Sequence, residues 1–202
     1  GKGGAHLGGG LSCIEIFAVL YGGVLRFDAR NPCWQDRDRF FVGKNHCVLA
    51  QFPALYEAGY IEEQDLRELT KDGGRINGYP WNVELGLEYS GGSLGMAISV
   101  AIGVALALRE KKSKSHIYVL MGDGELNEGS VWEAFMSAAQ YRLNNLTVII
   151  DRNRLCYDGD TEEVMALEDL DAKFQAFNWK CEHCNGHDVQ GLLRCLTEKQ
   201  SD

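Results

Sequence analysis

The chain has 202 residues, of which 45% are hydrophobic, and its formal net charge is −9. This acidic balance disfavours nucleic acid and anionic membrane surfaces as partners. The longest apolar run, residues 96–108, is too short to span a bilayer. An odd number of cysteines, seven, in a chain able to form a good core argues against a disulfide framework and favours a reducing, cytoplasmic compartment.

The N-terminal part alternates glycine-rich loops with short periodic segments. Six glycines in residues 1–10 predict a loop around His6, because glycine weakens helices and strands. Ser12 and Glu15 form an S-x-x-E capping pattern that predicts the start of a helix. The following residues predict, in order, a charged loop at 26–40, a strand at 40–44, helices at 47–58 and 62–70, and a loop at 73–81.

The C-terminal part contains two short apolar runs, residues 116–121 and 146–150, which predict buried strands. Ser130 and Glu133 repeat the capping pattern and predict the start of a helix between these two strands. The remaining predictions are a glycine-rich loop at 89–95, a helix at 93–109 buried nearly all round, a turn at 158–160, a helix over 167–177, a strand at 179–184 and a last helix capped by Asp188. The alternation predicts an α/β fold with a parallel sheet flanked by helices, as a single domain over residues 1–202 that looks trimmed at both ends.

Polar residues follow each of the two predicted strands. Gly122-Asp123-Gly124 comes directly after the first, and Asn153 comes shortly after the second. Because the carboxyl ends of parallel strands meet at one edge of a sheet, Asp123 and Asn153 should lie close together. Their oxygens suit Mg²⁺, and the N-terminus of the intervening helix favours an anion such as a diphosphate. The alternative is that Asp123 only caps that helix.

The Gly-Asp-Gly…Asn pattern resembles that of thiamine diphosphate enzymes, and residues 122–134 (GDGELNEGSVWEA) resemble transketolase. The similarity covers nearly the whole chain. Residues 31–40, N-P-x-W-x-D-R-D-R-F, resemble transketolases rather than deoxyxylulose phosphate synthases, which share the cofactor. The resemblance implies the thiamine diphosphate-binding fold and the diphosphate-binding half of an enzyme that moves a two-carbon ketol unit from a ketose (phosphate) donor to an aldose acceptor. It also implies a partner subunit or domain that binds the pyrimidine, with sugar phosphates as substrates.

The same resemblance assigns roles to individual residues. Asp123, Asn153 and the Leu155 carbonyl would bind Mg²⁺, or Ca²⁺ or Mn²⁺ in its place. The residues implied to border thiamine diphosphate are Gly92, Leu94, Gly124, Glu125 and Asn153. His6 and His46 match catalytic histidines that face the substrate, and Glu128 and Glu133 match glutamates that link two sites across the axis of a self-associated pair.

Three positions depart from the family pattern. Tyr79, within Gly78-Tyr79-Pro80, stands where transketolases usually carry a substrate-facing histidine, and a phenol donates one hydrogen bond without titrating near pH 7. Met96-Ala97 replaces a Gln-Gly pair, and Leu7 replaces a proline. These changes suggest an unusual ketose donor or acceptor, or impaired catalysis with the cofactor retained. The alternatives are a deoxyxylulose phosphate synthase-like enzyme, favoured by the stretch around His6, and a non-catalytic cofactor-binding or assembly subunit.

Cys181 and Cys184, with His183 and His187, have a spacing compatible with zinc. In a strand over 179–184, however, Cys181 and Cys184 would point to opposite faces, and no second C-x-x-C pair occurs. The sequence therefore disfavours a structural zinc site at this position.

Overall fold

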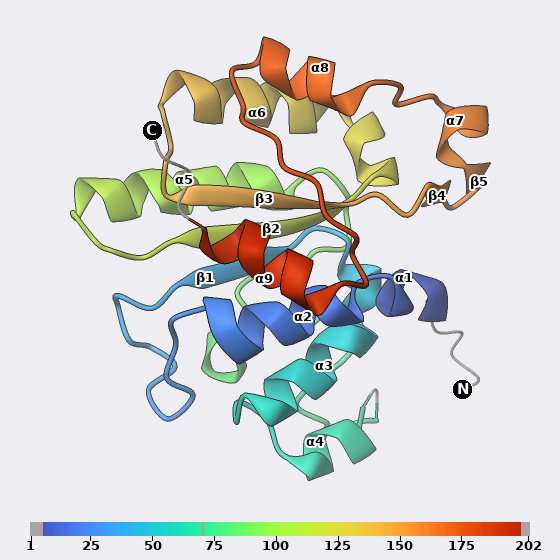
Figure 1. Cartoon of the computed structure of the whole chain (residues 1–202). Coiled ribbons are helices and arrows are strands. Elements are labelled where there is room, and N and C mark those ends of the chain that lie inside the picture. Colours follow the sequence, from blue (N-terminus) through green and yellow to red (C-terminus); the bar gives the residue numbers. More distant parts are fainter. Residues whose placement is uncertain (1–5, 70, 199–202) are drawn as a thin grey trace. The chain divides into compact units, whose positions relative to one another are not determined.

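The computed structural model describes residues 6–69 and 71–198. Its internal contacts divide the chain into two compact units. The first comprises the described parts of residues 1–35, 45–90 and 183–202, and the second comprises residues 36–44 and 91–182. Figure 1 labels the elements and colours them along the sequence, from blue at the N-terminus to red at the C-terminus. In the described part of the chain, no helix is long and apolar enough to span a bilayer.

The second unit is built on a parallel sheet with strand order β1-β2-β3. Its strands are β1 (Arg39–Val42), β2 (Ile117–Gly122) and β3 (Leu146–Asp151). All six residues of β2 are buried, as expected for the central strand of a sheet covered on both faces. The strands predicted at residues 40–44, 116–121 and 146–150 and their parallel arrangement are confirmed.

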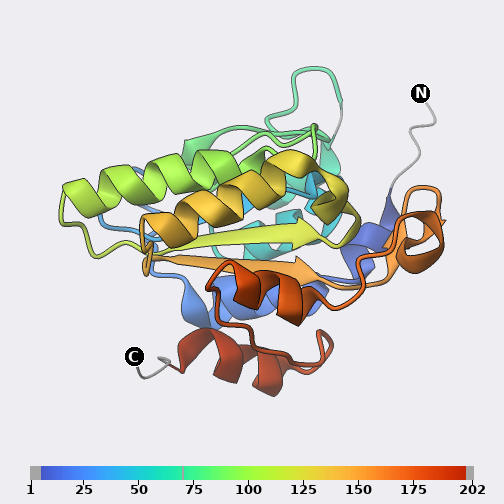
Figure 2. The ribbon, with the colours of Figure 1, turned by 90° about the horizontal axis from the view of Figure 1, so that it is seen from above.

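Two long helices, α5 (Ala97–Glu110) and α6 (Gly129–Gln140), pack against each other, and α5 also packs on β2. Figure 2 shows them side by side along the sheet. The prediction that α5 is buried nearly all round is wrong. Val100 is 41% exposed, and a side chain at Gly103 would meet no atom within 4 Å. One face of α5 is therefore made of small and apolar residues that the second unit leaves uncovered.

The chain after β3 forms a short hairpin of β4 (Leu155–Cys156) and β5 (Gly159–Asp160), followed by α7 (Thr161–Val164) and α8 (Leu170–Ala176). The predicted strand at 179–184 is wrong, because these residues adopt no regular secondary structure. The Trp179 indole instead donates a hydrogen bond to the Phe135 carbonyl at 3.0 Å and packs edge-on against the Phe135 ring. The aromatic side chain thus belongs to the core that α6 and α8 share.

The first unit consists of helices and turns, namely α1 (Leu7–Leu11), α2 (Ile14–Val19), a π turn (Leu20–Val24), a 3₁₀ turn (Asn45–Cys47), α3 (Val48–Glu57), α4 (Glu63–Arg67), a 3₁₀ turn (Val83–Leu85) and α9 (Val189–Thr197). Its core gathers around Phe52 and Leu55 of α3. Asp188 caps α9 as predicted, because its carboxylate accepts a hydrogen bond from the Gln190 N–H.

The start of the first unit differs from the prediction. Residues 7–11 form helix α1 instead of a loop. Their glycines allow a close approach to the 3₁₀ turn and α3, since a Cβ at Gly9 would lie 2.7 Å from the His46 ring. This tertiary packing offsets the intrinsic cost of glycine in a helix. Residues 1–5 of the predicted loop, and residue 70 of the predicted helix 62–70, lie outside the described residues.

The prediction that both S-x-x-E patterns form capping boxes is wrong. Ser12 ends α1, and its hydroxyl donates to the Gly9 carbonyl. Ser130 is the second residue of α6, whose N-cap is Glu128, and the Ser130 hydroxyl donates to the Gly95 carbonyl at 3.2 Å. Ser12 thus bonds within the helix that it ends and Ser130 bonds to a neighbouring segment, so neither serine is the N-cap of the following helix.

Replacement of Phe135 tests the aromatic core of the second unit. Phe135 is 1% exposed, and its ring lies 4.8 Å from that of Phe174. Phe135→Ala should lower the free energy of unfolding by about 3–5 kcal/mol, because it leaves a cavity in a closely packed core. Gln140 is exposed on the same helix, and Gln140→Ala should change it by less than about 0.5 kcal/mol. Urea denaturation measures both, and equal losses would contradict this account of the core.

Candidate functional site

The carboxyl ends of β2 and β3 are held in register. Gly122 pairs with Asp151 in the parallel ladder, and the Asp123 N–H donates to the Asp151 carbonyl at 3.2 Å. The turn after β2 and the loop after β3 therefore leave the sheet at the same edge (Figures 1 and 2). This arrangement places the two predicted ligand segments beside each other.

Asp123 lies at the centre of this edge, with its side chain 1% exposed. One carboxylate oxygen accepts from the Gly124 N–H at 2.8 Å. The other accepts from the Arg154 N–H at 2.6 Å and from the Arg152 guanidinium at 3.0 Å. The carboxylate of Asp123 is thus bonded directly to the loop that carries Asn153.

Asn153 is oriented by the end of its own strand. Its amide nitrogen donates to the Asp151 carboxylate at 3.1 Å, and its amide oxygen accepts from the Leu155 N–H at 2.9 Å. The same Asp151 oxygen accepts from the ammonium group of Lys44, which is 1% exposed and follows β1. Lys44 therefore joins the end of β1 to the end of β3.

Glu125 is a second buried carboxylate at this edge, 2% exposed. Its two oxygens accept from the Gly95 N–H at 2.9 Å and from the Gly122 N–H at 3.3 Å. Burial raises the pKa of Glu125, while these backbone donors and the charge of Lys44 oppose that rise. The glutamate therefore anchors one glycine-rich segment to the other.

The loop with Gly92 and Leu94 is held by this contact. Gly95 has a positive φ of 82°, and a Cβ there would lie 2.7 Å from that of Glu128, so only glycine fits. Gly92 is exposed and Leu94 is half-buried. Since Glu125 and Ser130 both bind Gly95, the structure brings residues 92–95 against the turn at 122–130.

The residues at this edge fit a hard divalent cation. Carboxylate, amide and carbonyl oxygens from Asp123, Asn153 and Leu155 are the donors that Mg²⁺ prefers. Among the described residues, no three His, Cys, Asp or Glu side chains are grouped so as to hold a metal ion. A cation at this edge must therefore be completed by amide and carbonyl oxygens, water or the oxygens of a bound ligand.

His6 and His46 lie together in the first unit, with ring centroids 5.5 Å apart in an edge-to-face arrangement. Tyr79 belongs to the same unit and is 52% exposed. Its loop is fixed locally, since the Tyr79 N–H donates to the Asn77 side chain at 2.9 Å and its carbonyl accepts from the Ser90 hydroxyl at 2.7 Å. Tyr79 thus presents its phenol from an ordered loop.

Glu128 and Glu133 both lie exposed at the start of α6 in the second unit. The seven cysteines are all free thiols. Cys181 lies beside Asp171, and burial together with the neighbouring Cys195 raises the pKa of Cys184 to about 11. The two thiols of the C-x-x-C pattern therefore face different neighbours.

Sequence reasoning missed Lys44, Arg152 and the carboxylate of Glu125 as members of this edge. For Lys44 and Arg152 the signal is a charged residue close behind a buried strand, since β1 ends at Val42 and β3 at Asp151. The pattern alone does not say which charge meets which, because their contacts join segments up to 107 residues apart.

Comparison with known proteins adds an independent finding. Residues 2–202 match the family model described as transketolase, thiamine diphosphate binding domain. One of the subunits of the apulose-4-phosphate transketolase of Phocaeicola vulgatus is 41% identical over 94% of this chain and 67% of the relative. The 6-deoxy-6-sulfo-D-fructose transketolase subunit SqwG of a Clostridium species is 35% identical over 96% of this chain and 70% of the relative.

Longer relatives match in the same region. Human transketolase is 33% identical over 92% of this chain, which covers 30% of that protein. The crystal structure of transketolase from Campylobacter jejuni aligns with a TM-score of 0.81 at 27% identity, over 90% of this chain and 30% of that chain. The transketolase structure from Leishmania mexicana gives a TM-score of 0.84 at 28% identity, over 93% of this chain and 33% of that chain. The chain belongs to the transketolase family, of which it carries the thiamine diphosphate-binding domain.

Proposed function

We propose that residues 1–202 form one cofactor-binding domain that supplies the diphosphate and metal side of a ketol transfer reaction. The observation that carries this proposal is the bonding of the Asp123 carboxylate to the loop of Asn153 at the aligned ends of β2 and β3. The family match supports the identity of the cofactor as thiamine diphosphate.

In this proposal Mg²⁺, or Ca²⁺ or Mn²⁺ in its place, is held by Asp123, Asn153 and the Leu155 carbonyl. Gly124 and the backbone of Glu125 border the diphosphate, together with the loop of Gly92 and Leu94. When bound, thiamine diphosphate supplies the electron sink that two-carbon transfer requires. Lys44 and Asp151 keep the Asn153 amide oriented, because their ion pair fixes the oxygen to which its nitrogen donates.

His6 and His46 act on the substrate in this proposal. Either imidazole ring can donate a hydrogen bond to a sugar hydroxyl or exchange a proton with it. Their closeness within the first unit supports a joint role. Tyr79 adds one hydrogen-bond donor for the substrate, its phenol hydroxyl.

The substrate is proposed to be a phosphorylated or sulfonated ketose with an aldose acceptor. Two relatives are named for apulose 4-phosphate and for 6-deoxy-6-sulfo-D-fructose. Tyr79 and Met96 depart from the usual transketolase residues, which supports an unusual ketose donor or acceptor here. Because the chain carries a net charge of −9, an anionic sugar must be bound by local cations.

The proposed enzyme also needs a second subunit. Two relatives, of which the chain covers 67% and 70%, are named subunits of transketolases, and the chain covers only 30% of human transketolase. A partner would provide the pyrimidine-binding domain. Seven free thiols support a reducing, cytoplasmic location for the complex.

Self-association is proposed through the exposed face of α5 and α6. Val100 and Met136 are 41% and 53% exposed, and Gly103 leaves open space between turns of α5. An apolar helical face of this kind suits a second copy of the chain. Glu128 and Glu133 lie at the start of α6. In such a pair they would link the cofactor sites of the two copies across the axis that relates them.

The proposed function first predicts how cofactor binding depends on Asp123, at the carboxyl edge of the sheet. Asp123→Asn should weaken Mg²⁺-dependent binding of thiamine diphosphate at least about tenfold, because it removes a charged ligand from the cation. Isothermal titration calorimetry with the cofactor, with and without Mg²⁺, measures this. Asp158→Asn, an exposed carboxylate in the hairpin after β3, serves as the matched control and should bind normally. Unchanged binding by Asp123→Asn would refute the metal site.

The second prediction concerns the need for a partner. The chain alone should show no turnover, and addition of the subunit encoded beside it should give ketol transfer from a phosphorylated or sulfonated ketose. Product analysis by mass spectrometry measures transfer. Robust transfer by the chain alone would contradict the proposal, and release of carbon dioxide from pyruvate would instead indicate a synthase.

A complex that binds the cofactor and turns over no sugar would indicate a non-catalytic subunit. The specific observation that favours this second function is Tyr79, which replaces a titratable histidine with a phenol. Restoring the family residue with Tyr79→His separates the two cases, since a gain of turnover would show that position 79 limits catalysis.

The third prediction concerns self-association. Val100→Glu should convert the self-associated form to a monomer, because a charge buried in an apolar interface lacks a partner. Sedimentation velocity measures the change. Tyr56→Glu provides a matched control, since Tyr56 is 40% exposed on α3 of the first unit. Equal effects of both variants would argue against the α5–α6 face.

A further inference from the structure

The positively charged guanidinium of Arg152 contacts Asp123, the proposed cation ligand. Its Nη1 donates to the Asp123 carboxylate at 3.0 Å and to the Thr161 hydroxyl at 2.7 Å. Its Nη2 donates to the Glu162 carboxylate at 2.5 Å. The Arg152 side chain is 29% exposed, and its guanidinium lies between a buried carboxylate and a more exposed one.

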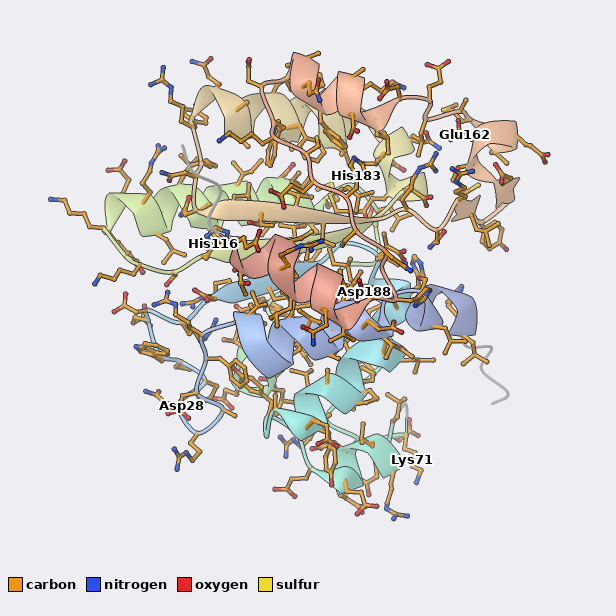
Figure 3. The ribbon with its side chains drawn as sticks, viewed as in Figure 1. Asp28, Lys71, His116, Glu162, His183 and Asp188 are labelled. Carbon is orange, nitrogen blue, oxygen red and sulfur yellow. The ribbon has the colours of Figure 1, made fainter. Side chains whose placement is uncertain are left out.

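Glu162 is itself held firmly in place on α7 (Figure 3). Its carboxylate accepts from the backbone N–H groups of Leu167 at 3.2 Å and Glu168 at 3.1 Å. The hydrogen bond from Arg152, followed by these backbone donors, lowers the pKa of Glu162. Glu162 therefore stays ionised at neutral pH and offers Arg152 a fixed anionic partner.

We propose that Arg152 is an internal counter-charge that competes with the divalent cation for Asp123, and that Glu162 sets how strongly it competes. The inference rests on the proposed metal role of Asp123. A guanidinium does not lose its proton in proteins, so its charge beside Asp123 opposes a second positive charge there. Only withdrawal of Arg152 from Asp123 removes that opposition.

The contacts of Arg152 keep the free-energy cost of its withdrawal from Asp123 small. If Arg152 releases Asp123, it keeps the bonds to Thr161 and Glu162. The loss is one charge-assisted hydrogen bond, and the arriving cation replaces it at Asp123. Without the cation, Arg152 compensates a carboxylate whose other donors, among the described residues, are backbone N–H groups. A buried charge without a counter-charge destabilises a fold.

The proposal predicts opposite effects for the two ends of this bridge. Arg152→Gln should tighten Mg²⁺ binding in the presence of thiamine diphosphate by roughly three- to tenfold, since a competing charge is removed. The same variant should lower the melting temperature of the metal-free chain, because Asp123 loses its counter-charge. Glu162→Gln should weaken Mg²⁺ binding by a similar factor, because Arg152 then rests fully on Asp123.

The decisive variant combines the two changes. If Glu162 acts through Arg152, the double variant Arg152→Gln/Glu162→Gln should bind Mg²⁺ as tightly as Arg152→Gln alone. If Glu162 acts directly through its own charge, its loss weakens binding in both backgrounds, and the inference is overturned. Arg152→Lys keeps the charge and should retain most of the wild-type affinity.

Calorimetric titration of the full chain with MgCl₂ at saturating thiamine diphosphate measures these affinities, and thermal unfolding without metal provides the second readout. Arg142→Gln removes the same charge from an exposed residue that follows α6 and should change neither. If the wild type binds Mg²⁺ normally and Arg152→Gln binds it equally or more weakly, the role of Arg152 is overturned and the proposed function is not affected. Absence of Mg²⁺-dependent cofactor binding by the wild type would overturn the proposed function and this inference with it.

Discussion

The structure of the second unit depends on one buried charge, the carboxylate of Asp123. A buried carboxylate costs several kcal/mol unless it is paired and hydrogen-bonded. Asp123 is 0% exposed, and it meets this requirement with the Gly124 N–H, the Arg154 N–H and the Arg152 guanidinium. Each donor comes from the turn after β2 or the loop after β3. The hydrogen bonds that compensate this one charge therefore hold the turn after β2 against the loop after β3.

Two other buried carboxylates of the second unit follow the same logic. Asp151 satisfies its carboxylate with Lys44 and the Asn153 amide, and Glu125 accepts from the backbone of Gly95 and Gly122. These groups all lie at the carboxyl edge of the sheet, while the interior of β2 is apolar. A fold selected for stability alone would gain little from so many buried ions at one edge. Their concentration is expected where a sheet binds a charged ligand.

The sequence predicts the sheet well, because short apolar runs and the register of parallel strands are local and repetitive. It also predicts that Asp123 and Asn153 share an edge, since parallel strands end together. It fails where tertiary contacts override local preference. The α1 glycines form a helix because they pack against His46, and Trp179 leaves the strand pattern to fill the core beside Phe135. The pairing of Arg152 with Glu162 is not predictable from the sequence, because it depends on where the hairpin places α7.

The contacts also separate the groups proposed to bind the cofactor from those proposed to select the sugar. Asp123 and Glu125 draw their partners from strand ends and glycine-rich turns, where a change of residue would disturb the sheet itself. Tyr79 is held through its own backbone by Asn77 and Ser90, so its side chain can change without disturbing those bonds. An exposed side chain on a loop fixed by its backbone is free to vary while the fold is preserved. On the proposed function, a change at Tyr79 therefore alters the side chain offered to the sugar and leaves the contacts of Asp123 and Asn153 as they are.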